Sequence, residues 1–285
     1  MHYFEEGGIP VRHDTDDRII WSVFTKPWKD MEAAALGAFV QRLGFEGIEF
    51  PLRPGYQVEP ENAEKGLPSL ARTLAAHGVR IMSVAGPTDE PTFAACARAE
   101  VPVIRIMCPI RGETYLEGEQ RIRKELDAME PLCARYGVTV GIQNHSNDFV
   151  NNACGLRRIL EGRDPRHIAA VWDAAHSALS GEDPEFGLDI VWSHLCMVNL
   201  KNAFWKQVNG PEAEIAEWQH YYTSGSRGIA SWQRIGRVLT SRGYHGVICL
   251  TAEYSAEEQV NRLIAADLAF ARSLLAEPPR RGESA

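Results

Sequence analysis

The chain has 285 residues, of which 45% are hydrophobic and 24% are charged; this composition is ordinary for a globular protein and excludes disordered and collagen-like classes. Its formal net charge of −8 at pH 7 disfavours a nucleic-acid partner, because binding a phosphate backbone needs a cationic surface. No apolar run is long enough to span a membrane, and the start of the chain lacks the basic and apolar regions of a secretory signal. The six cysteines are spaced singly, as reduced and mostly buried thiols are, so we expect a cytoplasmic protein.

Short apolar runs rich in Val and Ile alternate with amphipathic stretches along the whole chain. Runs of this kind are typical of buried parallel strands, because helices cover both faces of a parallel sheet. In chain order, the expected strands are Arg18–Phe24, Gly47–Pro51, Val79–Val84, Val101–Met107, Val138–Gln143, Ile168–Asp173, Leu195–Leu200 and Gly246–Glu253.

Helical patterns lie between these runs. Met31–Leu43, Gly118–Tyr136 and the stretch Val260–Leu275 each place apolar residues on one face, and we expect a kink at Pro131. Regular alternation of strand and helix over eight units favours a single (β/α)₈ TIM barrel, an α/β fold, over a doubly wound sheet. No G-x-G-x-x-G follows the first strand, so we expect no nucleotide cofactor.

No linker divides the chain, which predicts one domain over residues 1–285 with a frayed tail from about 278 to 285. One connection, Ala203–Ile229, is oversized and rich in aromatic residues. A loop after a barrel strand is where a pocket wall sits, so we expect Trp218, His220 or Tyr221 to reach toward a ligand.

Polar side chains gather at the ends of the last four expected strands. They include Gln143 and His145 after strand five, Asp173 and His176 after strand six, Asn199 and Lys201 after strand seven, and Glu253 after strand eight. Because residues two apart on a strand share a side, we expect Gln143, Asp173, Asn199 and Glu253 to meet at the C-terminal mouth of the barrel. Such a set could hold a hard divalent cation, or it could form a hydrogen-bonded polar plug.

Four motifs in order on successive strands carry a family resemblance. They are Asn144-His145, Asp173-x-x-His176, the Leu200-Lys201 pair and Gly243-Tyr-His-Gly246 leading to Glu253. Over residues 18 to 275 the chain resembles the xylose isomerase-like TIM barrels, the sugar phosphate isomerase/epimerase superfamily. The resemblance implies a barrel enzyme acting on a sugar or polyol.

The resemblance also implies a metal site with an altered ligand set. The family typically holds one divalent ion, often manganese, through Glu, Asp, His and Glu at the ends of strands five to eight. Asp173 and Glu253 match this pattern, whereas Gln143 stands in the place of the Glu and Asn199 in the place of the His. Amide oxygens coordinate a hard cation more weakly, so we expect manganese or magnesium to bind weakly or not at all.

The same departures bear on catalysis. The family's epimerases use two metal-binding carboxylates as acid and base on opposite faces of the substrate, and Gln143 cannot carry that proton. We therefore expect one acid/base centre built on Glu253, Lys201 and His176. Lys201 could instead form an ion pair with Glu253 or Asp173, and His176 could be a helix-start residue bonded to the backbone.

Six further residues are candidates for binding the substrate: Arg105, His145, Trp172, Trp218, His220 and Arg227. Arg105 could clamp a carboxylate or phosphate, or form a salt bridge that lines the barrel. Trp172 could stack on the substrate or belong to the core. Arg227 lies in a Ser-Gly-Ser-Arg-Gly turn that could contact an anion.

These observations predict a sugar or polyol isomerase or epimerase that abstracts a proton next to a carbonyl. A lyase or dehydratase acting on a keto-polyol is the alternative within the family, since it needs only one base. A barrel that only binds a sugar is a third hypothesis. A DNA-repair nuclease of the endonuclease four type shares the fold but needs three zinc ions, for which the chain offers few His ligands. The expected partner is a small-molecule sugar or polyol, with no nucleic acid and no membrane, and a homo-oligomer is compatible with the sequence.

Overall fold

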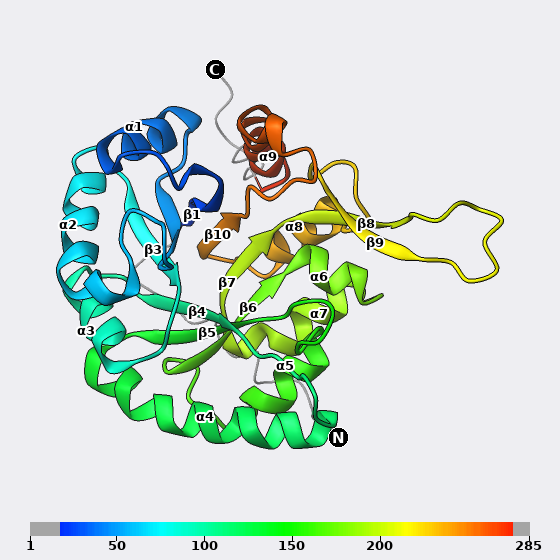
Figure 1. The fold of residues 1–285 in the computed structure, drawn as a ribbon, viewed down its shortest axis with the longest axis horizontal. Coiled ribbons are helices and arrows are strands. Elements are labelled where there is room, and N and C mark those ends of the chain that lie inside the picture. The colour runs from blue at the N-terminus through cyan, green and yellow to red at the C-terminus, as the bar shows by residue number, and fades with distance from the viewer. Residues whose placement is uncertain (1–17, 276–285) are drawn as a thin grey trace, which may run out of the picture.

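The computed structural model describes residues 18–275, so the expected frayed tail lies outside the described residues. Eight parallel strands close into a barrel in the order β1-β10-β7-β6-β5-β4-β3-β2, and helices surround it (Figure 1). The predicted (β/α)₈ barrel is therefore confirmed. None of the helices within residues 18–275 combines the length and the apolar character needed to cross a membrane.

The barrel strands match the apolar runs of the sequence to within a few residues. They are β1 (Ile19–Phe24), β2 (Gly47–Pro51), β3 (Arg80–Ala85), β4 (Val103–Met107), β5 (Thr139–Gln143), β6 (Ile168–Asp173), β7 (Leu195–Leu200) and β10 (Gly246–Leu250). The last strand was expected to reach Glu253 but ends at Leu250, and Ala252 has a left-handed backbone with φ 50°. Glu253 therefore lies in a loop, where strand alternation does not set its direction.

The helices pack around the barrel through apolar faces. They are α1 (Ala33–Leu43), α2 (Ala63–Ala75), α3 (Glu90–Arg98), α4 (Tyr115–Tyr136), α5 (Ala153–Leu160), α6 (Ala174–Leu179), α7 (Pro184–Val191), α8 (Trp232–Ser241) and α9 (Val260–Leu275), with 3₁₀ turns η1 (Lys26–Trp28), η2 (Pro60–Asn62), η3 (Trp192–His194) and η4 (Glu257–Gln259). The helix α4 continues through Pro131. A left-handed Gly ends α1 at Gly44 and α4 at Gly137, where the sequence predicted helix ends.

The barrel interior changes character along its axis. Small and apolar side chains such as Val103, Val171 and Met197 form a separate buried cluster inside the barrel. Two residues further along their strands, the inward positions are polar. One buried polar side chain comes from each of seven strands: Ser22, Glu49, Ser83, Arg105, Gln143, Asp173 and Asn199. We call this set the polar layer, and it forms the floor of the C-terminal mouth.

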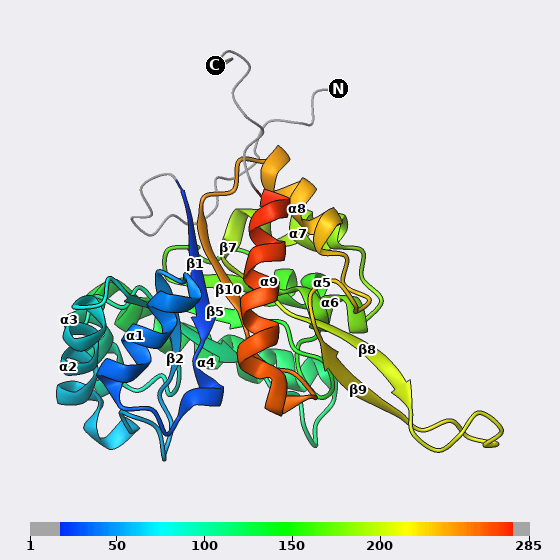
Figure 2. The same ribbon diagram turned by 90° about the horizontal axis from the view of Figure 1, so that it is seen from above.

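The oversized connection after β7 is largely a hairpin. Antiparallel strands β8 (Asn202–Gln207) and β9 (Trp218–Thr223) form a separate two-stranded sheet that projects sideways from the barrel (Figures 1 and 2). The sequence analysis treated this stretch as a loop, although the residues from 218 to 223 are the aromatic-rich kind that favour strands.

The side chain of Asn202 fastens the base of this hairpin. Its amide nitrogen donates to the carbonyl oxygens of Gly225 (2.7 Å) and Ala230 (2.8 Å), and its oxygen accepts from the amide of Ala230 (2.9 Å). Gly228 passes so close that a Cβ there would lie 1.9 Å from the Asn202 side-chain oxygen. Only glycine fits beside this anchor.

We expect Gly228→Ala to destabilise the protein by about 1–3 kcal/mol, because the new methyl group must displace the Asn202 side chain from its hydrogen bonds to Gly225 and Ala230. Urea unfolding monitored by circular dichroism measures the change. The matched control is Gly236→Ala in α8, where the nearest atom to a new Cβ is 3.3 Å away and alanine favours the helix. Equal stability of the Gly228→Ala variant and the wild type would contradict the role of the Asn202 anchor.

Candidate functional site

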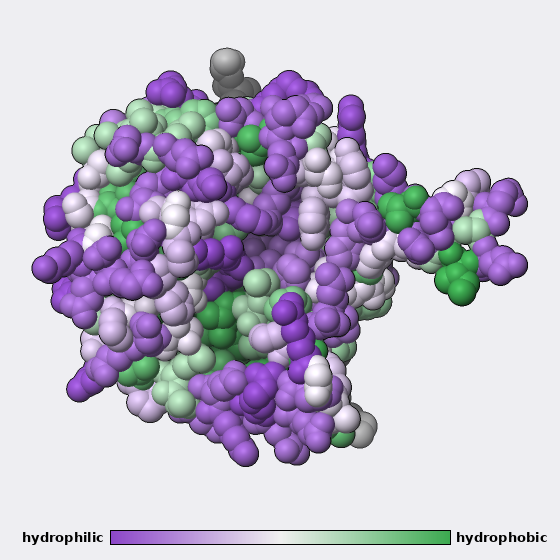
Figure 3. All heavy atoms as spheres, viewed as in Figure 1, coloured by the Kyte–Doolittle hydropathy of each residue, from purple (hydrophilic) through white to green (hydrophobic). Residues whose placement is uncertain are grey.

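The C-terminal mouth of the barrel is hollowed, and Figure 3 shows hydrophilic residues at its centre and a hydrophobic patch along its lower side. Asp173 lies at its floor, where both carboxylate oxygens are bonded. One accepts from the Gln143 amide (2.8 Å), and the other caps α6 by accepting from the backbone of His176 (3.0 Å). Burial raises the pKa of Asp173 to about 6, against the opposing charge of Lys201. Two of the expected strand-end residues, Gln143 and His176, thus meet the carboxylate of a third, Asp173.

A second carboxylate, Glu253, lies between two ammonium groups. Its oxygens accept from Lys201 (2.7 Å) and from Lys26 of η1 (2.6 Å). Burial alone would raise the pKa of Glu253, but the two lysines lower it to about 2. Burial alone would lower the pKa of Lys201, but the negative charge of Glu253 has the larger effect, so the pKa of Lys201 is raised. Both groups are therefore charged at neutral pH, and the expected alternative of a Lys201–Glu253 ion pair is what the structure contains.

The hairpin supplies Tyr222 to the same place. The Lys201 ammonium lies 3.8 Å from the centre of the Tyr222 ring, a cation–π contact. Burial raises the pKa of the Tyr222 hydroxyl. His220, two residues away on the same face of β9, packs on Trp205 with ring centres 4.4 Å apart. The hairpin face that carries His220 and Tyr222 therefore forms one side of the mouth.

Two histidines of the mouth pack against each other, with their rings tilted by 36°, in opposite tautomers. The rings of His145 and His176 have centres 3.9 Å apart. The Nδ1 of His145 donates to the Ser146 carbonyl (2.9 Å), so its Nε2 is the free acceptor. The Nδ1 of His176 accepts from the backbone and hydroxyl of Ser146, so its Nε2 carries the proton. Burial, followed by the charge of Lys201, lowers the pKa of His176, and burial chiefly lowers that of His145; both are therefore neutral at pH 7.

Arg105 crosses the barrel interior to Glu49 of β2. Its Nε donates to a Glu49 oxygen (2.7 Å), a second guanidinium nitrogen bonds the same oxygen, and the guanidinium lies 5.2 Å from the Phe24 ring centre. Burial alone would lower the pKa of Arg105, but the charge and hydrogen bonds of Glu49 have the larger effect and raise it. The barrel-lining salt bridge that the sequence left open as one reading of Arg105 is present.

Several buried polar atoms of the mouth have no hydrogen-bond partner within residues 18–275. They are the free side-chain oxygens of Ser22, Glu49, Gln143 and Asn199, and the Nε2 atoms of His176 and His220. Native proteins pair almost all buried polar groups. Four oxygens and two imidazole nitrogens without partners make the mouth the place where a polar ligand would find hydrogen-bonding groups.

Other expected residues lie away from the mouth. Trp172 alternates with Asp173 and is buried between the barrel and the helices. Trp218 is 55% exposed on the hairpin, Tyr221 stacks on Phe204 on the other hairpin face, and Arg227 is exposed in a turn. The structure thus brings Arg105, His145 and His220 to the mouth and leaves Trp172, Trp218 and Arg227 outside it.

Three mouth residues were missed by the sequence analysis: Lys26, Glu49 and Tyr222. Glu49 had a detectable signal, since it is the one charged residue of an otherwise apolar strand, the pattern that marked Arg105. Tyr222 follows from alternation with His220 once the stretch is recognised as a strand. Lys26 had no signal, because its partner Glu253 is 227 residues away in the chain.

The residues present do not fit the divalent ion that the family resemblance implies. Within residues 18–275 no three His, Cys, Asp or Glu side chains lie close enough to share an ion. Both oxygens of Glu253 already face ammonium groups, and both oxygens of Asp173 already accept hydrogen bonds. At the four positions that the family uses for its ion, only the amide oxygens of Gln143 and Asn199 remain unpaired, and these are weak ligands for a hard cation.

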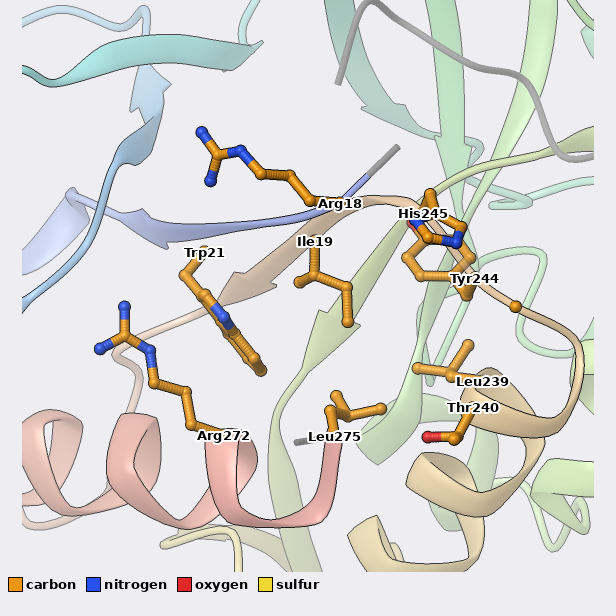
Figure 4. Close-up of a pocket in the computed structure, with 10 residues that line it drawn as sticks. Arg18, Ile19, Trp21, Leu239, Thr240, Tyr244, His245, Arg272 and Leu275 are labelled. Atoms are coloured by element: carbon orange, nitrogen blue, oxygen red, sulfur yellow. The ribbon is translucent and has the colours of Figure 1, made fainter. Parts of the chain in front are cut away.

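Another hollow, of about 410 Å³, lies at the opposite end of the barrel between β1, α8 and α9 (Figure 4). Its lining includes Arg18, Trp21, His245 and Arg272. The guanidinium groups are engaged, Arg18 with Glu46 and Arg272 with the carbonyl of Gly44 (2.7 Å). This hollow is separate from the mouth and plays no part in the site.

Comparison with known proteins agrees with this architecture. A family model described as xylose isomerase-like TIM barrel matches residues 38–274. The chain belongs to this family. One curated relative, an inosose dehydratase of Geobacillus thermodenitrificans (strain NG80-2), is 22% identical over 133 residues, which is 45% of this chain and 45% of that enzyme. The match thus spans less than half the length of that curated relative.

Solved structures of similar fold cover most of the chain. The 3-keto-D-glucoside 4-epimerase YcjR from E. coli superposes with a TM-score of 0.70 at 14% identity, over 90% of this chain and 100% of that one. The probable 3-DHS dehydratase AsbF from Bacillus anthracis superposes with a TM-score of 0.68 at 14% identity, over 88% and 97%. At 14% identity, these likenesses show the fold of the chain and nothing beyond it.

Asp267 of α9 ties the Glu253 loop to the base of the hairpin. One of its oxygens accepts from the Tyr254 hydroxyl (2.9 Å), and the other accepts from the backbone of Gly225 (2.9 Å). Ser255 and Tyr222 add two further hydrogen bonds between the same segments, each 3.0 Å. Burial raises the pKa of Asp267 to about 6.

We expect Asp267 to make stability depend on pH. The folded protein holds the Asp267 proton more tightly than the unfolded chain does, where the usual pKa is 3.8. The free energy of unfolding therefore falls as pH rises from about 4 to about 6, by up to about 3 kcal/mol from this group. Asp267→Asn should remove that part of the slope, measured by urea unfolding at a series of pH values.

Asp30→Asn, at an exposed position, is the matched control and should leave the slope unchanged. Tyr254→Phe tests the hydrogen bond itself, because it removes a donor that stabilises the carboxylate. It should destabilise the protein more at pH 8 than at pH 5. An Asp267→Asn variant with the wild-type pH slope would show that Asp267 does not carry the effect.

Proposed function

We propose that the protein is an enolising enzyme that removes the proton next to the carbonyl of an uncharged keto-sugar or keto-polyol. The observation that carries this proposal is the neutral imidazole of His145, with a free Nε2, in the same mouth as the buried ammonium group of Lys201, whose charge acts on it. A base and a fixed positive charge in one cavity are the two elements that enolisation needs.

His145 is the base in this proposal. Its Nδ1–H is held by the Ser146 carbonyl, which fixes the tautomer and leaves Nε2 unprotonated. Its ring is only partly buried, so a substrate in the mouth can reach it. The lowered pKa keeps the imidazole unprotonated at neutral pH. A base with a pKa near the working pH is the most effective, because it is free and still accepts the proton.

Lys201 stabilises the negative charge that develops on the carbonyl oxygen. Glu253 then has a different role from the acid/base role expected from the sequence: with a pKa of about 2 and a lysine on each oxygen, it fixes Lys201 and keeps it charged. His176 offers its Nε2–H as a donor to a substrate oxygen. Proton abstraction in this scheme uses the residues of the chain alone.

The charges and unpaired atoms of the mouth support an uncharged, hydroxyl-rich substrate. Lys26 and Lys201 are paired with Glu253, and Arg105 is paired with Glu49, so the mouth has no excess positive charge to bind a phosphate or carboxylate. The unpaired oxygens of Glu49, Gln143 and Asn199 are acceptors, and hydroxyl groups are the donors that would satisfy them. A polyol offers several such donors on neighbouring carbons.

The enolate has two outcomes. His145 can give its proton to the former carbonyl carbon while the proton of the α-hydroxyl passes to the former carbonyl oxygen, which is isomerisation. Alternatively, it can protonate the hydroxyl on the β-carbon as the enolate expels it, which forms a carbon–carbon double bond and releases water. The second outcome is favoured by the single base of the mouth and by the inosose dehydratase among the curated relatives. Epimerisation needs an acid and a base on opposite faces of the substrate, and the amide of Gln143 cannot serve as the second of these groups.

We expect His145→Gln to lower kcat by about 10²–10⁴-fold, since glutamine keeps hydrogen-bonding capacity without basicity. The assay incubates an inosose or a ketohexose in D₂O and follows deuterium uptake at the α-carbon and loss of water by NMR. The wild-type rate should fall as pH drops through a value below 6.5, the usual pKa of histidine, because the base becomes protonated.

His167→Gln, at the opposite end of β6, is the matched control and should keep the wild-type rate. If Glu253 were the base, the acid limb of the profile would lie near pH 2 and His145→Gln would remain active. That pair of results would overturn the proposal. So would the finding that no keto-sugar or keto-polyol takes up deuterium in the presence of the protein.

A further inference from the structure

The charged groups at the mouth are matched in number. Three carboxylates, Asp173, Glu49 and Glu253, face three cations, Arg105, Lys26 and Lys201. Glu253 bridges two of the cations, and Glu49 holds the third. The side chains of the site therefore sum to zero charge without any added ion.

The backbone places Glu253 where it can bridge the two lysines. The φ of 50° at Ala252 turns the chain just before Glu253, a conformation that costs a residue with a Cβ about 1–3 kcal/mol. The turn directs the carboxylate toward η1, which follows the neighbouring strand β1, and Lys26 meets it there. A strained residue of this kind persists only where the surroundings hold it, and the two ion pairs do so.

We infer that the Lys26–Glu253–Lys201 bridge takes the place of the divalent ion in this family member, so that the mouth excludes Mn²⁺ and Mg²⁺. A cation bound to Glu253 would have to displace two ammonium groups or lie within a few ångströms of both, where like charges repel strongly. Its other ligands would be the Gln143 and Asn199 amides and an Asp173 whose oxygens are already bonded. Excess positive charge and weak donors both oppose binding.

Replacing Lys26 distinguishes two explanations for a lack of metal binding, namely the ammonium bridge and the mere loss of two ligands at Gln143 and Asn199. If Gln143 and Asn199 alone prevented binding, removing Lys26 would change nothing. If the ammonium bridge prevents it, Lys26→Met frees one oxygen of Glu253 and removes one opposing charge. Lys26 is 45% exposed, so this substitution leaves the fold in place.

The test is calorimetric titration of the chelator-treated protein with MnCl₂, with Mn²⁺ electron paramagnetic resonance as a second readout. We expect no saturable site in the wild type. Gln143→Glu with Asn199→His should create weak binding, and adding Lys26→Met to that pair should tighten it by about tenfold or more, since the charge of the ligand set governs affinity. Lys29→Met, an exposed neighbour, is the matched control and should tighten nothing.

A wild-type protein that takes up one equivalent of Mn²⁺, with binding lost in Glu253→Gln, would overturn the inference. So would a triple variant that binds no more tightly than the double one. The inference concerns the site of the proposed function but is measured without turnover. If no substrate is enolised, calorimetry still decides it; if Mn²⁺ binds and enolisation is observed, the proposed function stands and this inference fails.

Discussion

The buried ammonium group of Lys201 is the constraint on which the arrangement of the mouth depends. A charge out of contact with water costs several kcal/mol unless it is paired and hydrogen-bonded. Glu253 supplies the counter-charge, the Tyr222 ring supplies a π face, and the Trp232 indole holds the Lys201 carbonyl (3.2 Å). Each of these partners comes from a different connection after a barrel strand or from the helix that follows. Folding the mouth therefore means assembling the environment of one lysine.

The same charge sets the state of its neighbours. A positive charge nearby disfavours protonation of imidazole, so Lys201 adds to the burial that keeps His145 and His176 neutral. Opposite tautomers then give the pair an acceptor on one ring and a donor on the other. Asp173 is affected in the opposite sense, since Lys201 limits the rise in pKa that burial causes. Burial is thus the largest cause of all three pKa shifts, and Lys201 reinforces those of the two histidines and opposes that of Asp173.

The amino-acid pattern predicted the barrel and half of its mouth, for reasons that lie in particular residues. Apolar runs rich in Val and Ile identified all eight strands, and alternation correctly placed Gln143, Asp173 and Asn199 inward, because the period of a strand is fixed by its backbone. Strand alternation could not predict the direction of Glu253, because β10 ends before it and Ala252 turns the chain. The pairs Lys26–Glu253 and Arg105–Glu49 link elements far apart in the chain, so no local pattern indicates them.

The unpaired oxygens of the polar layer reduce the stability of the fold but are available to bind a ligand. An unsatisfied buried acceptor costs about 1–3 kcal/mol, so several in one layer weigh heavily against a total stability of about 5–15 kcal/mol. Elsewhere the protein avoids that cost: the half-buried carboxylate of Glu182 accepts from the Ala153 backbone (3.0 Å) and the Ser177 hydroxyl (2.6 Å). The unpaired oxygens of Glu49, Gln143 and Asn199 differ, because no donor of the described residues meets them. The hydroxyl groups of the proposed substrate would donate to these oxygens, so binding would recover part of the stability that the polar layer costs.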